Sequence, residues 1–232
     1  MDKDVFRFRQ FSVSQSQCAM KVGTDGVLLG AWAQAQGDLL LDIGTGTGLI
    51  ALMLAQRNGQ AEVQAVDIDP AAARQAGDNF ALSPWGNRLQ AHCADFTAWH
   101  TNGMYDEIVS NPPFYQDTLP AATHGRDVAR GGSRRFLEGL VGFSLQHLKP
   151  QGILEVILPC EVGESFAFDA WVMGLHVQRK TLVRTRPDKP PKRVLLQLGR
   201  MPVACDPSEL CLLDPDGSRS QAYQQLTADF YL

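Results

Sequence analysis

Residues 39–48 of this 232-residue chain read LLLDIGTGTG, and they decide the fold. The first five have the length and apolarity of a buried strand, and the glycines that follow allow a tight turn and a close approach to a ligand. Residues 49–56 then have the pattern of a helix. The stretch therefore predicts a strand, a glycine-rich loop and a helix in succession. The loop glycines are Gly44, Gly46 and Gly48.

The alternation of strand and helix continues along the chain. Strands of one sheet are predicted at 39–43, 62–67, 88–93, 106–110, 153–158, 177–184 and 193–199. Helices are predicted at 49–56, 70–82, 134–148 and 161–173. This order indicates an α/β fold with a seven-stranded, mostly parallel sheet and helices on both faces. Only a short proline-rich loop separates the last two strands, so we expect them to form an antiparallel hairpin.

The length favours one globular domain with short additions. We expect three parts. Residues 1–36 form an N-terminal strand and helix that complete the ligand pocket of the glycine-rich loop, 37–200 form the core, and 201–232 form a C-terminal extension with a turn at 214–217. In the first part, 5–13 alternates apolar and polar residues like a strand. Thr24 is a candidate N-cap for a helix through 27–32.

The composition is ordinary for a soluble globular enzyme, with 44% hydrophobic and 20% charged residues. No apolar run approaches the roughly 20 residues that cross a bilayer, and the N-terminus does not read as a signal peptide. We therefore expect a cytoplasmic protein without a membrane partner. The five scattered cysteines lack a C-x-x-C pair and predict reduced thiols. The five histidines lack ligand spacing, so no metal is expected.

Charge is unevenly distributed along the chain, although the net charge is only −4. Twelve of the 21 cations fall in two short segments, 126–135 and 179–200. If the fold brings these segments together, they form a surface for an anionic ligand on an otherwise acidic body. Two separately solvated faces are the alternative that charge alone leaves open.

The glycine loop by itself leaves two cofactors open. Residues 46–51 fit the G-x-G-x-x-G/A pattern of dinucleotide enzymes, with Asp67 at the spacing of a ribose-binding acid. However, Asp42 directly before the loop could pair with an ammonium group, which S-adenosylmethionine has and NAD lacks. Asp95, after the third strand, could accept a hydrogen bond from an adenine amine. A purely structural turn, with Asp67 and Asp95 as helix caps, is the remaining alternative.

Asn111-Pro112-Pro113-Phe114 follows the fourth strand and is the candidate catalytic loop. The lone pair of an aromatic amine is delocalised into the ring. Two acceptors that each take a hydrogen bond from one N–H group help the nitrogen to become pyramidal and to direct its lone pair toward a methyl donor. The Asn111 side-chain oxygen and the Pro112 carbonyl can supply them, and the prolines fix the backbone. Phe114 offers a face for base stacking, which contributes about 1–3 kcal/mol. The alternative is a simple N-P turn.

Together, the glycine loop and the acids after the next two strands resemble the nucleotide pocket of class I methyltransferases. The resemblance implies a Rossmann-like fold, with S-adenosylmethionine held at the ribose by Asp67 and at the adenine by Asp95. The N-P-P-F motif is of no use to a dehydrogenase. Within the methyltransferases, it marks transfer to adenine N6, guanine N2 or a glutamine amide nitrogen.

Residues 20–32, MKVGTDGVLLGAW, narrow the choice among these methyl acceptors. With the strand at 5–13, they resemble the tRNA1(Val) adenine-37 N6-methyltransferases, and the resemblance covers nearly the whole chain. It implies that Thr24, Asp25 and Gly26 approach the methionine end of the cofactor, although a plain helix N-terminus is the alternative. It also implies methylation of an unpaired adenine beside the anticodon of a tRNA, since a loop base is already partly free.

Basic residues on both sides of the catalytic loop are expected to contact tRNA phosphates, and no obligate protein partner is evident. They are Arg126, Arg130, Arg134, Lys189, Lys192 and Arg193. A ribosomal RNA guanine-N2 methyltransferase and a glutamine-N5 methyltransferase acting on protein remain the alternatives. A nucleotide-binding module without catalysis is disfavoured by the intact Asn111-Pro112-Pro113.

Overall fold

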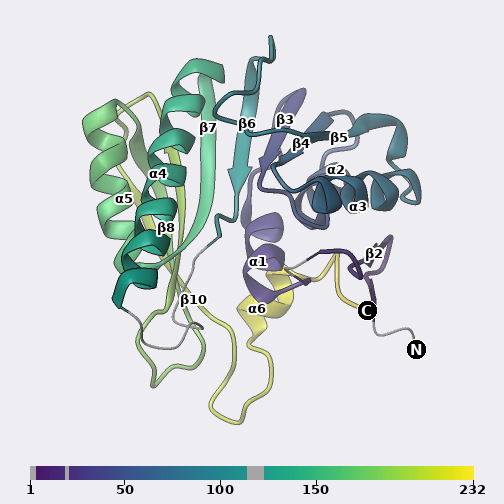
Figure 1. The fold of residues 1–232 in the computed structure, drawn as a ribbon. Coiled ribbons are helices and arrows are strands. Elements are labelled where there is room, and N and C mark those ends of the chain that lie inside the picture. Colours follow the sequence, from purple (N-terminus) through teal and green to yellow (C-terminus); the bar gives the residue numbers. More distant parts are fainter. Residues whose placement is uncertain (1–3, 19–20, 114–122) are drawn as a thin grey trace.

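The computed structural model describes residues 4–18, 21–113 and 123–232, and the side chains of 123–131 lie outside that description. Its core is an eight-stranded sheet of order β10-β8-β9-β7-β6-β3-β4-β5 (Figure 1). The sheet strands are β3 (Leu39–Ile43), β4 (Glu62–Asp67), β5 (Leu89–Cys93), β6 (Tyr105–Ser110), β7 (Leu148–Pro159), β8 (His176–Arg184), β9 (Arg193–Gly199) and β10 (Asp206–Cys211). A separate hairpin consists of β1 (Val5–Arg7) and β2 (Ser12–Ser14).

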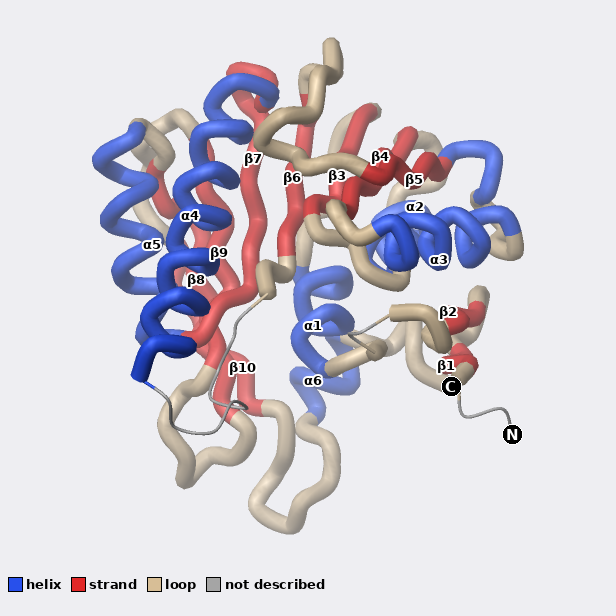
Figure 2. Tube along the Cα trace, in the orientation of Figure 1, coloured by secondary structure: helices blue, strands red, loops and turns tan. Residues whose placement is uncertain are grey.

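Helices cover both faces of the sheet, as Figure 2 shows. They are α1 (Thr24–Trp32), α2 (Leu49–Arg57), α3 (Pro70–Ala81), α4 (Thr123–His147), α5 (Cys160–Met173) and α6 (Gln221–Leu226), with a 3₁₀ turn at Gly86–Arg88. Within the described parts of the chain, none of these helices combines the length and the apolarity needed to span a membrane.

Each face of the sheet has its own apolar core. Neighbouring strand residues divide between the two cores because successive side chains point to opposite faces. Leu40 and Val109 pack with α1 and α2, whereas Leu41 and Ile108 pack with α4 and α5.

The predicted fold class is confirmed. The sheet is parallel except at β9, which is antiparallel to both β7 and β8. The predicted hairpin of the last two core strands is therefore present. All seven predicted core strands exist, and the turn at 214–217 closes with a hydrogen bond from the Gly217 amide to the Asp214 carbonyl of 2.9 Å.

Three sequence predictions were wrong. The strand expected at 5–13 is a hairpin that turns between Arg7 and Ser12. Thr24 is the first helical residue and not the N-cap, which is Gly23 without a side-chain cap. The sheet has an eighth strand, because β10 of the C-terminal extension pairs in parallel with β8. Exposed, partly charged residues dominate β10, so it lacks the apolar pattern of a core strand.

The two ends of the chain pack together. The Arg9 amide donates to the Phe230 carbonyl at 2.9 Å, and its Nε donates to the Tyr231 carbonyl at 2.6 Å. The ring of Phe8 stacks on that of Tyr231 with centroids 6.1 Å apart. The C-terminus accordingly lies beside the β1–β2 hairpin in Figure 2. The C-terminal extension therefore packs against the N-terminal segment.

Two buried carboxylates anchor the connection between α1 and β3. Glu155 on β7 and Glu107 on β6 are each 0% exposed. Their oxygens accept hydrogen bonds from the backbone amides of residues 34, 35 and 36 at 2.9–3.2 Å. Arg179 donates to Glu155 at 3.0 Å and lies over the Trp32 ring, 3.5 Å from its centroid. These contacts fix the end of α1 against the middle of the sheet.

The charge state of this network depends on pH. Burial, followed by the neighbouring charge of Glu107, raises the pKa of Glu155 well above its ordinary value, while Arg179 lowers it. When the folded state raises the pKa of a carboxyl, the folded protein is most stable with that carboxyl protonated. Its contribution to stability is therefore present at low pH and is lost as the pH rises through the folded-state pKa.

We predict that Arg179→Met destabilises the protein by about 3 kcal/mol at pH 8, because it leaves a buried carboxylate without its cation. The difference from the parent should shrink at pH 5, where Glu155 is more nearly neutral in both proteins. Urea unfolding at the two pH values measures this. Arg184→Met on the same strand is the matched control, since its partner Glu209 is 58% exposed and the pair is worth less than about 1 kcal/mol. Equal losses in the two variants would contradict the prediction.

Candidate active site

The site forms where the strand order reverses. β3 lies between β6 and β4 and is parallel to both, so the loops after β3 and β6 leave the sheet at the same edge. The ends of these strands are tied together, because the Ser110 hydroxyl donates to the Ile43 carbonyl at 2.8 Å. This contact starts the glycine loop and the Asn111 loop next to each other, and both loops line one cavity.

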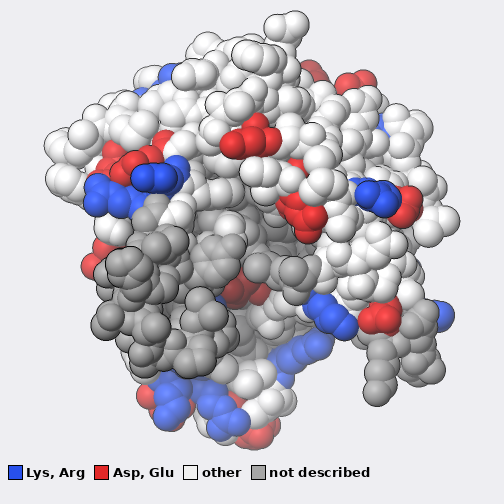
Figure 3. Space-filling model, viewed as in Figure 1, with Lys and Arg blue, Asp and Glu red and all other residues white. Residues whose placement is uncertain are grey.

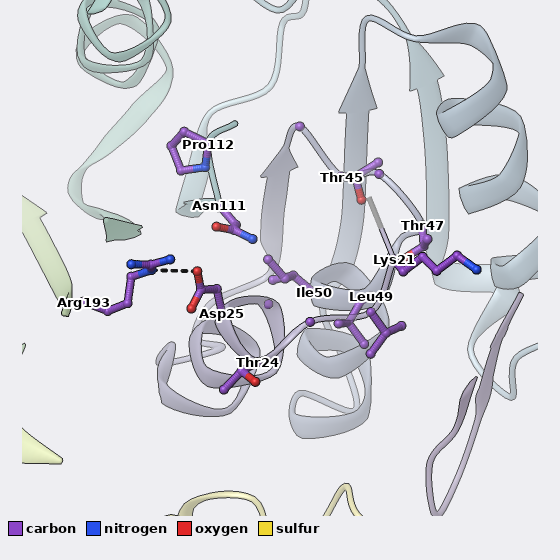
Figure 4. Close-up of a pocket in the computed structure, with 15 residues that line it drawn as sticks. Lys21, Thr24, Asp25, Thr45, Thr47, Leu49, Ile50, Asn111, Pro112 and Arg193 are labelled. Atoms are coloured by element: carbon purple, nitrogen blue, oxygen red, sulfur yellow. Dashed lines mark hydrogen bonds and ion pairs between the residues drawn. The ribbon is translucent and has the colours of Figure 1, made fainter. Parts of the chain in front are cut away.

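The cavity has a volume of about 370 Å³, within the range of small-molecule sites. Its walls come from the segment before α1, the glycine loop, the start of α2, the loop after β6 and the first residue of β9 (Figure 4). The lining residues that were predicted for the cofactor, catalysis or RNA are Thr24, Asp25, Gly26, Gly44, Gly46, Asn111, Pro112 and Arg193. Residues predicted from four separate sequence motifs thus share one cavity.

The glycine loop has the backbone that the sequence predicts. Gly44, Gly46 and Gly48 all have positive φ, at 73°, 56° and 81°. A Cβ at Gly48 would lie 2.5 Å from a ring carbon of Phe80, so this glycine is required for packing and does not line the cavity. At Gly46, by contrast, a Cβ would have no atom within 4 Å and would project into open space. The loop therefore forms an open cradle of the kind that a nucleotide fills.

Asp42 lies beneath this cradle and not at the cavity wall. It is 0% exposed, and its Oδ2 accepts hydrogen bonds from the Thr45 hydroxyl at 2.6 Å and the Ala51 amide at 3.2 Å. Its Oδ1 has no partner among the described residues. Burial raises the pKa of Asp42 to about 7. The structure shows this carboxylate holding the loop to α2, and its pairing with a ligand ammonium stays a prediction.

Asp67 and Asp95 also make local contacts and do not line the cavity. Asp67 accepts from the Gly46 amide at 2.9 Å and from the Asp69 amide at 2.9 Å. The N-cap of α3 is Asp69, so Asp67 is not the cap that the alternative interpretation proposed. Asp95 is exposed and accepts from the amide and the hydroxyl of Thr97. Their contacts to ribose and adenine remain predictions.

The first turn of α1 forms the wall opposite the glycine loop. Gly26 is buried and packs closely on α2, since a Cβ at this position would lie only 3.1 Å from the Leu49 side chain. Asp25 faces the cavity and accepts a hydrogen bond from Arg193 Nε at 2.8 Å (Figure 4). Arg193 was predicted as a surface contact to phosphate, yet the structure places it inside the cavity. No local pattern indicates that these two residues, 168 positions apart, would pair.

The Asn111 loop enters the same space. In Figure 4 the Asn111 side chain points toward the middle of the cavity, with Pro112 behind it. Pro112 is buried, and the Pro113 carbonyl accepts from the Ser133 hydroxyl of α4 at 3.5 Å. Phe114, the predicted stacking residue, lies outside the described residues. The structure therefore places Asn111 and Pro112 at the cavity, as the motif predicts. The stacking role of Phe114 stays a prediction.

The other cations predicted for RNA are exposed where their side chains are described. Arg134 is 73% exposed and pairs with Glu138 at 2.8 Å, while Lys189 pairs with Asp188 at 3.5 Å. Lys192 is also exposed. The side chains of Arg126 and Arg130 lie outside the described part of the chain. Figure 3 shows Lys and Arg side chains gathered along the lower border of the hollowed face.

Several cavity residues were not predicted. They are Lys21, Val22, Gly23, Thr45, Thr47, Leu49 and Ile50. Most follow or precede a predicted glycine or threonine directly. No motif in the sequence marks the Lys21 ammonium or the threonine hydroxyls as cavity groups, so the geometry of the loops is what identifies these residues.

Comparisons with known proteins agree with the class that fold and site indicate. Residues 16–165 match the methyltransferase small domain family. The fold is similar to that of a predicted O-methyltransferase from Agrobacterium tumefaciens, with a TM-score of 0.67 and 18% identity over 89% of this chain and 96% of that one. It is also similar to the glycopeptide N-methyltransferase MtfA complexed with S-adenosyl-L-methionine, with a TM-score of 0.58, 13% identity and coverage of 78% and 100%. Fold and site thus define an S-adenosylmethionine-dependent methyltransferase.

Curated relatives specify the family further. The chain is 44% identical to the tRNA1(Val) (adenine(37)-N6)-methyltransferase of Serratia proteamaculans, over 98% of this chain and 89% of that protein. It is 42% identical to the protein of the same name from Bacteroides fragilis, over 100% and 99% of the two chains. The chain belongs to the tRNA1(Val) (adenine(37)-N6)-methyltransferase family. The nicotinamide-dependent dehydrogenase that the glycine loop left open is therefore wrong.

Asp42 generates a prediction about pH. Its folded-state pKa is raised, so it favours the protonated form, and its contribution to stability is lost as the pH rises from about 4 to about 7. Asp42→Asn stays neutral throughout. Between these pH values we expect the parent to lose up to about 4 kcal/mol relative to the variant, since one pKa unit corresponds to about 1.4 kcal/mol. Urea unfolding from pH 4 to 7.5 measures this difference.

The exposed Asp206→Asn variant is the control, and its profile should follow that of the parent. Parallel profiles for the parent and Asp42→Asn would show that the Asp42 carboxyl does not titrate in this range.

Proposed function

We propose that this chain transfers a methyl group from S-adenosylmethionine to N6 of adenine 37, beside the anticodon of tRNA1(Val). The observation that carries the proposal is the shared cavity of the glycine loop and Asn111-Pro112. The names of relatives that match nearly the whole chain support the choice of adenine in this tRNA. Such a substrate would place the enzyme in the cytoplasm.

The residues of the cavity fit the donor. A nucleoside needs a backbone surface without side chains, which the open space at Gly46 supplies. The Asp67 carboxylate holds the Gly46 amide and is close to that surface for a ribose. When bound, the donor supplies a methyl group that is already activated as a sulfonium. Thr24, Asp25 and Gly26 would hold its methionine end, and Asp95 would hold its adenine.

The Asn111 loop would prepare the acceptor. Asn111 Oδ1 and the Pro112 carbonyl would accept hydrogen bonds from the two N–H groups of the adenine amine and direct its lone pair toward the methyl carbon. The N–C bond would form as the C–S bond breaks, S-adenosylhomocysteine would leave, and the excess proton on N6 would pass to water. The prolines hold both acceptors in place before the base arrives, so little reorganisation is needed at the moment of reaction. Phe114 would stack on the base. Alignment and the exclusion of water would supply most of the acceleration, since the donor is already activated.

The cations at the border of the face would hold the RNA around the target base. We assign this role to Arg126, Arg130, Arg134, Lys189 and Lys192. Contacts of this kind bind phosphates without reading sequence, so they position the anticodon arm but do not select it. Selection of the tRNA would come from the unpaired bases near the target.

We predict that Asn111→Ala lowers the methylation rate about 10²- to 10³-fold, because it removes one of the two acceptors that hold the amine. Affinity for S-adenosylhomocysteine should stay near that of the parent. The measurement is incubation of purified protein with donor and unmodified total tRNA, followed by digestion and mass spectrometry. Asn102→Ala, which changes an exposed asparagine between β5 and β6, is the matched control and should keep full activity.

The product of the parent enzyme decides among the alternatives. N6-methyladenosine supports the proposal, whereas N2-methylguanosine would point to the guanine-N2 reaction. Methylation of protein glutamine without methylation of RNA would point to the glutamine-N5 reaction. An Asn111→Ala enzyme with undiminished rate would overturn the catalytic role of the loop.

The RNA surface gives a further prediction. Arg134→Ala combined with Lys189→Ala should weaken binding of the tRNA and flatten its dependence on salt. Removing one cation that binds a phosphate lowers the slope of log K against log salt by roughly 0.7–0.9. Fluorescence anisotropy between roughly 50 and 300 mM salt, where such binding is measurable, provides the slopes. Arg74→Ala on the exposed side of α3 is the control and should keep the slope of the parent. An unchanged affinity and slope in the double variant would refute the assignment.

A further inference from the structure

The cavity contains an ion pair that joins the N-terminal segment to the far end of the sheet. Asp25 on α1 accepts from Arg193 Nε on β9 at 2.8 Å. The side chains are 31% and 29% exposed. A pair that water reaches to this extent contributes little net stability, because solvent screens it and both charges can be hydrated separately. The fold therefore does not depend on keeping these two groups together.

Asp25 has a special position among the cavity residues. Of the described residues that line the cavity, it alone has a carboxylate. Asp42 is sealed beneath the loop and does not reach the wall. The donor of the proposed reaction has an ammonium group and a sulfonium, and both are cationic. Asp25 is therefore the group in this cavity to which a cationic end of the donor is attracted.

Arg193 is placed toward the acceptor. Figure 4 shows its guanidinium beside Asp25, on the side of the cavity from which Asn111 and Pro112 approach. Besides Asp25, it donates only weakly to the Lys192 carbonyl, from Nη1 at 3.3 Å. No described residue accepts from Nη2. A guanidinium forms charge-assisted, often bidentate bonds with phosphate, so an RNA strand entering here would be a strong competitor for it.

We propose that the Asp25–Arg193 pair is exchanged when the substrates bind. Asp25 turns to the ammonium of the donor, and Arg193 is released to a phosphate next to the target adenine. Each substrate then frees the partner that the other one needs. The inference rests on the proposed function and adds to it a pair of positioning residues that links the two binding sites.

The exchange makes binding of donor and RNA cooperative. Without the donor, RNA must break the ion pair before it can bind Arg193. With the donor bound, the pair is already open, so RNA binding no longer includes the free energy of breaking it. By linkage, RNA must raise the affinity for the donor by the same factor. Couplings between sites typically lie at about 5- to 150-fold. Because this pair is partly exposed, we expect a factor near the lower end of that range.

The test uses two probes that differ in the relevant group. S-adenosylhomocysteine has the amino-acid end with its ammonium and carboxylate, whereas 5′-methylthioadenosine has the same nucleoside and lacks that whole end. Binding of an unmodified anticodon stem-loop RNA is measured by fluorescence anisotropy with each compound at saturation. We expect S-adenosylhomocysteine to tighten RNA binding about 5-fold or more and methylthioadenosine to leave it nearly unchanged. Calorimetric titration of S-adenosylhomocysteine with and without RNA must return the same factor.

Variants separate the exchange from a merely structural role. Asp25→Asn should bind RNA more tightly than the parent in the absence of donor, because Arg193 is already free, and should show little coupling. Arg193→Gln should bind RNA more weakly and also lose the coupling, whereas Arg193→Lys should retain part of it. Glu209→Gln, which breaks the ion pair with Arg184, is the matched control and should keep the coupling of the parent. Thermal melting checks that each variant is folded.

Equal RNA affinity of the parent with and without S-adenosylhomocysteine would overturn the exchange. So would a coupling that persists in folded Asp25→Asn. These outcomes are distinct from failure of the proposed function, which would show as absence of N6-methyladenosine when the parent enzyme is incubated with tRNA and donor.

Discussion

Parallel pairing of β3 with β6 is the constraint on which the site depends. The pairing sets Ile43 opposite Ser110, and the Ser110 hydroxyl closes the two strand ends. Parallel strands end at the same edge, so the glycine loop and the Asn111 loop must emerge side by side. Apolar side chains on both faces of these strands enforce the register, since a shift by one residue would exchange the two cores. The stability of the sheet and the position of the candidate catalytic residues therefore have the same origin.

A second constraint fixes the N-terminal wall of the cavity. α1 is buried over most of its length, but apolar packing alone would allow a helix to slide. Glu107 and Glu155 prevent this by binding three consecutive backbone amides directly after the helix. Arg179 and Trp32 seal the same region from the other side. Two buried carboxylates are expensive, so the fold accepts an electrostatic cost to place Thr24, Asp25 and Gly26 at the cavity.

The sequence predicted those features that local patterns encode. Strand periodicity and the glycine loop were sufficient for the core. The N-P-P-F motif, at the end of the strand beside the glycine loop, correctly predicted that Asn111 and Pro112 lie near that loop, since both line the same cavity. β10 was missed because it is an exposed edge strand whose pattern depends on its neighbour β8. The hairpin after Arg7 was missed because its aromatic side chains pack against Tyr231, at the other end of the sequence. The N-cap at Gly23 was missed because it makes no side-chain capping bond that a sequence pattern could indicate. The Asp25–Arg193 contact had no local signal at all, because tertiary structure alone brings α1 to β9.

Electrostatics unites the cavity with the surface around it. The body of the protein is acidic, yet at the wall of the cavity the single described carboxylate is matched by Arg193. A cationic donor and an anionic RNA must meet there, and a fixed charge of either sign would favour one substrate at the expense of the other. A pair that opens at small cost presents the needed charge to each. Partial exposure of Asp25 and Arg193 is therefore compatible with function, whereas complete burial would keep the two residues bound to each other.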